Sequence, residues 1–173
     1  MPPDLKQCVM IAAPHTTNWD LPYTLAAFGV FRIPVRFTIK KEWLKPPFGF
    51  LMRFLGAIGI DRRPKSARGE KISFTEAMAR LFDENEHLAV LVTPEGTRSY
   101  VEQWKTGFYY VAKMANVPIA LGFLDYKEKH AGVGKIVYTT DDMEADLRKI
   151  MEFYSTKGAK FPEKFSIDKR YSP

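Results

Sequence analysis

The sequence predicts an α/β fold: a single layered domain over residues 1–173, with a mostly parallel central sheet flanked by helices. Short apolar segments typical of strands alternate along the chain with segments of helical periodicity. Such alternation is typical of a parallel sheet with helices on its faces. The apolar segments are nearly uninterrupted, as expected for strands that are covered on both faces. A chain of 173 residues is long enough to bury a sizeable core as one domain.

Six segments are predicted as strands. They consist mainly of aliphatic and β-branched residues, and turn-forming or polar residues separate them from the helical segments. The predicted strands are CVMIAA (8–13), VRFTI (35–39), AIGI (57–60), LAVLV (88–92), PIALGFL (118–124) and KIVYT (135–139).

Four helices are predicted between and after these strands. The first begins in LPYTLAAFGVF, directly after Asp20. In the segments 74–82, 108–115 and 143–154, apolar side chains recur at intervals of three and four residues. This spacing places them on one face of a helix. An aspartate pair ending at Asp142 precedes the last helix, where the helix dipole favours negative charge.

Composition narrows the class of protein. A single cysteine, Cys8, excludes an intramolecular disulfide and is typical of a reducing compartment. No run reaches 18 apolar residues, and residues 1–14 lack the pattern of a signal peptide. We therefore expect a cytoplasmic protein without a membrane span.

The positive charge is concentrated in the first half of the chain. Residues 1–80 hold 13 Lys and Arg against 6 Asp and Glu, whereas residues 81–173 hold 13 against 14. A basic patch of this kind indicates an anionic partner: a phosphorylated substrate, an anionic lipid surface or a nucleic acid. The alternative is a basic face that is simply solvated.

The turn after the first predicted strand carries a histidine and a carboxylate. In APHTTNWD, His15 and Asp20 are five positions apart, a spacing that a short strand-to-helix turn can close and a regular helix cannot. A carboxylate that binds an imidazole fixes its tautomer, so that the histidine can act as a general base. The alternative is a structural histidine beside a helix-capping aspartate.

No protein nucleophile accompanies this pair. A G-x-S-x-G motif is absent, and Cys8 lies inside a predicted buried strand, where a thiol is usually inert. The other histidines, His87 and His130, are not at a metal-ligand spacing from His15, so no metal site is predicted. A base without a nucleophile indicates that a hydroxyl of the substrate is activated.

Two further strand ends carry polar motifs. The strand in GAIGIDRRPK ends at Asp61, and five cations follow within ten positions, beginning with Arg62 and Arg63. Arginine suits phosphate because its planar fork donates two hydrogen bonds, although a solvated basic loop is the alternative. The strand LAVLV leads into PEGTRS, where Gly96 permits a close backbone approach to an anion.

The blocks HTTNWD, GIDRR, PEGTRS and VPIALGFLDY occur in the order and rough spacing of the four motif blocks of the glycerolipid acyltransferases. The sequence resembles the 1-acyl-sn-glycerol-3-phosphate acyltransferase group of the lysophospholipid acyltransferase superfamily. The resemblance extends to about residue 125, and the pairing of His-x4-Asp with PEGTRS is highly specific. It implies the glycerolipid acyltransferase variant of the α/β fold.

The resemblance also implies a role for each matching residue. His15 would be the catalytic base and Asp20 would orient it. Backbone amides near Gly96 would stabilise an oxyanion, and Pro118 would shape the acyl side of the site. The substrate-binding residues would be Gly59, Asp61, Arg62, Arg63, Glu95, Gly96, Thr97 and Arg98.

Residues 40–56, KKEWLKPPFGFLMRFLG, are the candidate membrane contact. The segment mixes aromatic and aliphatic residues with four cations, which suits a helix lying in the interface of a bilayer. The alternative is that these aromatics belong to the core. We expect peripheral attachment at the inner face of the membrane.

The sequence thus predicts an O-acyltransferase that moves a fatty acyl group from acyl-CoA or acyl-carrier protein to a lysophospholipid such as 1-acylglycerol-3-phosphate, with no bound cofactor or metal. The first alternative keeps the fold and takes a lyso-aminolipid or another hydroxylated lipid as acceptor. The second is a non-catalytic domain that binds anionic lipid. A thioester hydrolase is the third. Nucleic acid is not expected as a partner, because RNA binding of this kind needs exposed aromatics on a sheet face, and the strands here are predicted to be buried on both faces.

Overall fold

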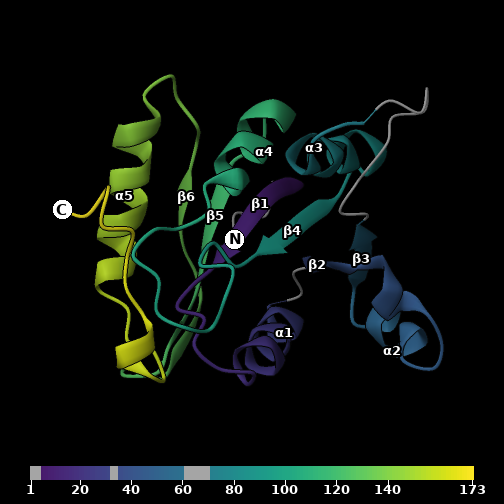
Figure 1. Cartoon of the computed structure of the whole chain (residues 1–173), viewed down its shortest axis with the longest axis horizontal. Helices are drawn as coiled ribbons and strands as arrows, with labels where there is room; N and C mark the ends of the chain where they lie inside the picture. Colours follow the sequence, from purple (N-terminus) through teal and green to yellow (C-terminus); the bar gives the residue numbers. More distant parts are fainter. Residues whose placement is uncertain (1–4, 32–34, 61–70) are drawn as a thin grey trace.

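The structure, a computed structural model, describes residues 5–31, 35–60 and 71–173. In this part of the chain six strands form one sheet in the order β3-β2-β4-β1-β5-β6, in which only β6 is antiparallel to its neighbour (Figure 1). The predicted α/β class with a mostly parallel sheet is therefore confirmed. The strands are β1 (Gln7–Ala12), β2 (Val35–Lys40), β3 (Ala57–Ile60), β4 (Leu88–Val92), β5 (Ile119–Asp125) and β6 (His130–Val137).

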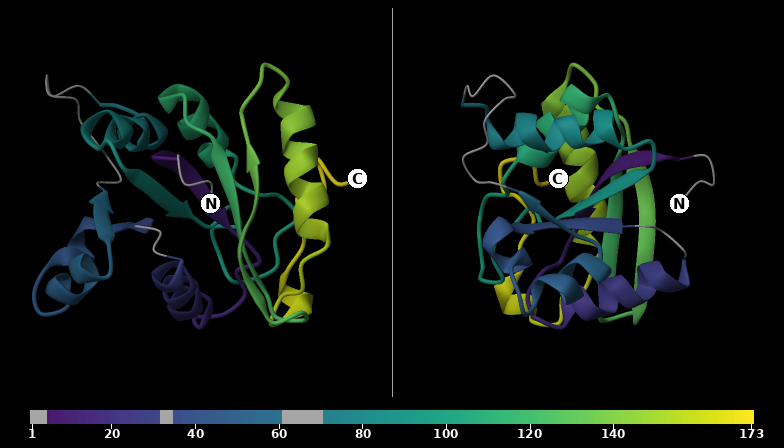
Figure 2. Two further views of the ribbon diagram at one scale, coloured as in Figure 1. Left: turned by 180° about the vertical axis from the view of Figure 1, so that it is seen from behind. Right: turned by 90° about the vertical axis from the view of Figure 1, so that its right-hand side faces the viewer.

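Helices cover both faces of the sheet. The right-hand view of Figure 2 shows α1 and α2 along one side and α3 and α4 along the other, and α5 packs beyond β6 in Figure 1. None of the described helices is long and apolar enough to cross a membrane. The helices are α1 (Asp20–Val30), α2 (Gly49–Phe54), α3 (Phe74–Glu84), α4 (Gly107–Ala115) and α5 (Met143–Ser155), with short 3-10 helices η1 (Lys41–Leu44) and η2 (Pro162–Lys164).

Alternation along the central strands builds two hydrophobic clusters. In β1, Val9 and Ile11 belong to the larger cluster with side chains of α3, α4 and α5, whereas Cys8 and Met10 belong to a smaller cluster with Phe28 of α1. Every residue of β1 from 8 to 11 is fully buried. The central strands are therefore covered on both faces, as their uninterrupted apolar sequences predict.

The sixth strand differs from its prediction. It begins at His130, five residues earlier than predicted, and ends at Val137. It forms a hairpin with β5, and the pairing starts at Asp125 and His130. Most of its residues are exposed or only partly buried, because as the edge strand it has a neighbouring strand, β5, on one side only. Two glycines, Gly132 and Gly134, also interrupt the apolar run that would have marked its start.

Side chains cap the first turns of two helices, and one of them belongs to the aspartate pair that the sequence analysis placed before the last helix. Asp142 caps α5 by accepting a hydrogen bond from the amide of Ala145 at 2.9 Å. Ser73 caps α3 by accepting one from the amide of Glu76 at 3.0 Å. Each cap satisfies an amide that has no partner inside the helix.

Candidate active site

The turn between β1 and α1 brings His15 and Asp20 together. Nδ1 of His15 lies 3.1 Å from Oδ2 of Asp20. Asp20 is the first residue of α1, and its carboxylate folds back over the turn, accepting the amides of Thr16 at 2.8 Å and Thr17 at 2.9 Å. The carboxylate therefore satisfies two buried backbone amides and holds the turn in the shape that places His15.

Four donors surround the Asp20 carboxylate. The fourth is the hydroxyl of Tyr126, which donates to Oδ1 at 2.7 Å. Burial alone would raise the pKa of Asp20, but the hydrogen bonds from His15, Tyr126 and the amides of Thr17 and Thr16 outweigh it and lower the pKa. Asp20 is thus a carboxylate at neutral pH, and a carboxylate can only accept hydrogen bonds.

An ionised Asp20 determines which nitrogen of His15 carries the proton. Because Oδ2 only accepts, the shared hydrogen belongs to Nδ1 of the imidazole. Nε2 of the neutral ring is then an acceptor. The side chain is 22% exposed, so the ring is held by its buried neighbours and remains accessible to a substrate. This is the geometry of a general base whose tautomer is fixed.

Glu95 supports His15 from the neighbouring strand. It follows β4, and its Oε1 accepts the amide of His15 at 2.9 Å. The residue is 5% exposed, and Oε2 has no hydrogen-bond partner in the described part of the chain. Burial raises the pKa of Glu95 to about 7, despite the opposing hydrogen bond from His15. Glu95 therefore positions the backbone of His15.

Two cavities meet at His15. The larger, of about 500 Å³, runs between the ends of β1 and β4 and helices α3 and α4, and its lining is mainly apolar, including Met78, Leu91 and Phe108. The smaller, of about 360 Å³, is polar and is lined by residues of the loop after β4. Its lining residues are His15, Thr93, Gly96, Thr97, Arg98 and Ser99.

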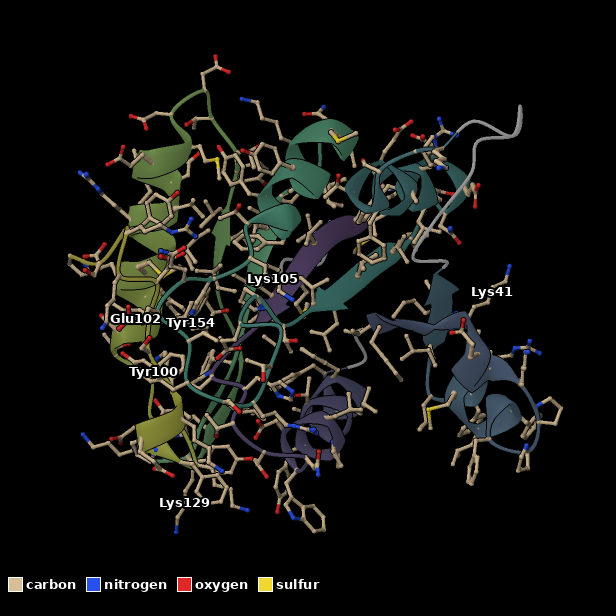
Figure 3. The ribbon with its side chains drawn as sticks, viewed as in Figure 1. Lys41, Tyr100, Glu102, Lys105, Lys129 and Tyr154 are labelled. Atoms are coloured by element: carbon tan, nitrogen blue, oxygen red, sulfur yellow. The ribbon has the colours of Figure 1, made fainter. Side chains whose placement is uncertain are left out.

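Lys105 adds a cation to this site. It lines the apolar cavity beside His15, and its amide donates to the carbonyl of Pro94 at 2.8 Å. Its side chain crosses Gly96 so closely that a Cβ atom there would lie 2.7 Å from the ammonium nitrogen. Figure 3 shows Lys105 beside the end of β4. No carboxylate of the described chain forms an ion pair with Lys105, and its charge is therefore available to a ligand.

The model of a protein family described as Acyltransferase matches residues 3–120. The chain belongs to the acyltransferase family. It is therefore an acyltransferase, and the alternative of a non-catalytic lipid-binding domain is excluded. The match includes the turn of His15 and Asp20 and the loop that carries Glu95. No curated protein and no solved structure matches the chain significantly.

Some of the sequence-predicted site residues of the acyltransferase lie at the two cavities, and others do not. His15 and Gly96 line both cavities, and Thr97 and Arg98 line the polar one. Asp61, Arg62 and Arg63 lie outside the described residues. Gly59 lies on β3, paired with Ile39 of β2, where a Cβ atom would lie 2.5 Å from the side chain of Leu44.

Pro118 lies at the opposite end of the sheet from His15. It precedes β5, and its carbonyl accepts the amide of Val9 at 3.0 Å, near the start of β1. Among the described residues, it is not one of those that line either cavity at His15. The placement gives no support to the expected role of Pro118 on the acyl side.

The sequence analysis did not name Tyr126 or Lys105 as residues of the acyltransferase site. Tyr126 stands 106 positions from Asp20, so no local pattern could connect them. Tyr126 is the last residue of the motif block VPIALGFLDY, but nothing in the sequence assigned a role to it. Lys105 could have been suspected as a cation that closely follows PEGTRS.

Cys8 is buried and its pKa is raised to about 12 by desolvation, so its thiol stays neutral.

Proposed function

We propose that this acyltransferase moves a fatty acyl group from a thioester, on coenzyme A or acyl-carrier protein, to a hydroxyl of a lysophospholipid such as 1-acylglycerol-3-phosphate. The observation that carries the proposal is the position of His15 at the border of an apolar and a polar cavity. A fatty acyl chain suits the apolar cavity. A polar head group suits the polar one, where Arg98 is available to an anion.

His15 is the base of the proposed reaction. Its Nε2 takes the proton from the acceptor hydroxyl, and the oxygen attacks the thioester carbonyl to form a tetrahedral intermediate. Collapse of the intermediate forms the ester bond, breaks the carbon–sulfur bond and releases the thiolate, which takes the proton back from the imidazolium. No bound cofactor or metal is part of this proposal.

Two groups are proposed to stabilise charge on the substrates. Backbone amides of the loop at Gly96, whose φ is +68°, are candidates for the oxyanion of the intermediate. Arg98 lines the polar cavity, and the ammonium of Lys105 lies against Gly96, where the two cavities meet; both cations are proposed to hold the phosphate of the acceptor. Arg62 and Arg63 are proposed as further phosphate ligands on the basis of the motif resemblance.

The test is an acyl-transfer assay with a panel of lyso-lipids, against acyl-CoA and acyl-carrier protein, with the products identified by mass spectrometry. Phosphate-bearing acceptors should be preferred, and the His15→Gln variant is the matched inactive control. Equal use of a lyso-aminolipid without phosphate would move the acceptor class to the first alternative. Release of free fatty acid without any acylated lipid would identify a thioester hydrolase and contradict the proposal.

We also propose that the enzyme docks on the inner face of the membrane as a peripheral protein. Phe50 and Phe54 of α2 are 83% and 80% exposed, while Met52 and Leu55 of the same segment pack against the smaller core cluster. The alternative that the whole aromatic segment belongs to the core is therefore wrong for Phe50 and Phe54. Exposed cations, including Lys45 and Arg53, flank these rings, a combination that favours an anionic bilayer surface.

A further inference from the structure

The far side of the Asp20 carboxylate is held by a tyrosine that lies beyond the matched part of the chain. Oδ2 of Asp20 accepts from His15, Thr16 and Thr17, whereas Oδ1 accepts from the hydroxyl of Tyr126 at 2.7 Å. In the described part of the chain, this hydroxyl is the only donor to Oδ1. Tyr126 follows β5, and the family match ends at residue 120.

Two segments outside its own turn fix the position of Tyr126. Its amide donates to the carbonyl of Gly158 at 2.8 Å, in the chain after α5. The ring of Tyr23, on α1, meets its ring edge-on with 6.3 Å between the centroids. The turn that follows Tyr126 carries Lys129 on the molecular surface (Figure 3). The chain after α5 thus holds the backbone of Tyr126, whereas the hydroxyl of Tyr126 binds Asp20 at the start of α1.

The phenol of Tyr126 can only donate to Asp20. Burial, followed by the hydrogen bond to Asp20 and the charge of that carboxylate, raises the pKa of Tyr126 above its ordinary value. The hydroxyl therefore keeps its proton at neutral pH. The other titratable groups near the pair are His15 on the turn, Tyr23 on α1, Glu95 after β4 and Lys160, whose ammonium lies 5.9 Å from the ring centroid of Tyr126.

We propose that Tyr126 is a positioning residue of the active site: by donating to Oδ1 it fixes the rotation and the charge of Asp20, so that Oδ2 faces Nδ1–H of His15. This rests on the proposed role of His15 as the base. Tyr126 lines neither of the two cavities at His15, so it acts through Asp20 and not on a substrate. The Tyr126–Asp20–His15 series extends the site into a part of the chain that the family match does not reach.

Removal of the hydroxyl leaves Oδ1 of a buried carboxylate without its donor. Asp20, which is 4% exposed, would then lose one of the hydrogen bonds that lower its pKa, and the pKa rises. The carboxylate also gains freedom to rotate away from His15, so the Nδ1–H tautomer is less populated. General-base catalysis contributes roughly 10²–10⁴-fold, and we expect Tyr126→Phe to lose part of it, about tenfold in kcat.

The experiment compares Tyr126→Phe with Tyr109→Phe. Tyr109 is a matched control because its hydroxyl also donates to a buried carboxylate, Oδ2 of Asp146, at 3.0 Å, between α4 and α5. The first measurement is the tautomer of His15 by ¹⁵N NMR of histidine-labelled protein. The chain has three histidines, and the signals lost in His15→Gln identify the one of interest.

In Tyr126→Phe we expect a smaller Nδ1–H population at His15, about tenfold lower kcat and unchanged KM values. In the plot of kcat against pH, the fall of kcat on the acid side should move to higher pH. Tyr109→Phe should leave all four unchanged. The double variant Asp20→Asn/Tyr126→Phe should be no slower than Asp20→Asn, since Tyr126 acts only through Asp20. A wild-type tautomer and profile in Tyr126→Phe, or additive losses in the double variant, would overturn the proposal.

The same measurements separate this proposal from the proposed function. The NMR experiment needs no substrate, so it reports on Tyr126 even if every lyso-lipid in the panel fails as an acceptor. If His15→Gln kept full activity, the role of His15 as base would fall, while a tautomer change in Tyr126→Phe would still establish the contact. If Tyr126→Phe does not fold, Asp20→Asn provides the second test: with the Tyr126 hydroxyl donating to the amide oxygen, the amide nitrogen should face His15 and remove its Nδ1–H preference. An unchanged Nδ1–H preference in Asp20→Asn would show that Tyr126 does not set the rotation of residue 20 and would overturn the proposal.

Discussion

At the scale of single residues, the decisive contact is the 3.1 Å approach of Nδ1 of His15 to Asp20. If His15 is the base, His15→Gln should lower kcat at least about 10²-fold, because general-base catalysis contributes roughly 10²–10⁴-fold. The fold should persist, since the amide of His15 still donates to Glu95. Circular dichroism and a steady-state assay check both expectations. A folded variant with full turnover would remove His15 from the mechanism.

Glu95 makes stability depend on pH. Its pKa is raised from 4.5 to about 7 in the folded protein, so its contribution to stability is fully present below pH 4.5 and is lost as the pH rises to about 7. A shift of this size corresponds to about 3 kcal/mol at most. The free energy of unfolding of wild type, relative to that of Glu95→Gln, should therefore fall by up to that amount between pH 4.5 and pH 8. Urea unfolding of both proteins over this pH range measures it. Parallel pH curves for the two proteins would contradict the raised pKa.

The sequence predicted the dyad well and its surroundings less well. His15 and Asp20 were found because they lie in one short turn, where spacing decides the contact. Tyr126 and the buried orientation of Glu95 arise from neighbouring strands of the sheet, and no spacing in the chain encodes which strands become neighbours. The arginines at 62 and 63 were predicted from residue type and from the motif resemblance, and they lie outside the described residues.

At the scale of elements, the loop from Pro94 to Lys105 joins the two cavities. Gly96 has a φ of +68°, and Lys105 lies across its α-carbon. We therefore expect Gly96→Ala to impair the enzyme twice: a left-handed backbone costs a residue with a Cβ about 1–2 kcal/mol, and the new Cβ displaces the Lys105 ammonium.

Kinetics can separate these two effects. If Lys105 holds the acceptor phosphate, Lys105→Met should raise the KM of the acceptor without changing the melting temperature, and Gly96→Ala should raise the same KM while also lowering the melting temperature. Lys105→Arg, which keeps the charge, should retain more of the acceptor affinity. An effect of Lys105→Met on the thioester KM alone would assign the lysine to the donor instead.

The C-terminal segment braces this loop. Asp168, which is 1% exposed, accepts the amide of Trp104 at 2.9 Å, and the indole of Trp104 donates to the carbonyl of Ser166 at 2.9 Å. Arg170 closes the contact by donating to the carbonyl of Trp104 at 2.9 Å. The sequence analysis assigned no role to this tail, because the tail bonds to residues over 60 positions away in the chain.

Asp168→Ala should therefore destabilise the protein by about 1.5–3 kcal/mol, the range for hydrogen bonds to a charged group. The pKa of Asp168 is lowered because its hydrogen bonds, with Arg170 first among them, outweigh the effect of burial. The stabilisation is thus present above the unfolded pKa and is lost as the pH falls through the folded one. Glu163→Ala, which changes an exposed carboxylate of the same C-terminal segment, is the matched control for thermal unfolding. Equal melting temperatures for the two variants would show that the segment does not brace the loop.

At the scale of the whole molecule, the mostly parallel sheet and its flanking helices followed from the alternation of apolar segments and helical patterns, whereas the strand order came only from the structure. What the sequence could not decide was which aromatics of residues 40–56 face water. Helical spacing places Met52 and Leu55 on one side of the segment and Phe50 and Phe54 on the other, but only the packed sheet shows which side is inside.

The exposed aromatics lead to a prediction about membrane binding. We expect the enzyme to sediment with anionic vesicles and not with neutral ones, and high salt should weaken the binding, because electrostatic attraction is screened within about 8 Å at physiological ionic strength. Phe50→Ser/Phe54→Ser should weaken vesicle binding with little change in melting temperature, because both rings lie in water in the free protein. Tyr138→Ser is the matched control, since Tyr138 is 69% exposed just after β6. If the double variant binds vesicles as well as Tyr138→Ser does, α2 is not the docking surface. If wild type binds no vesicle of any composition, the enzyme meets its acceptor away from the bilayer.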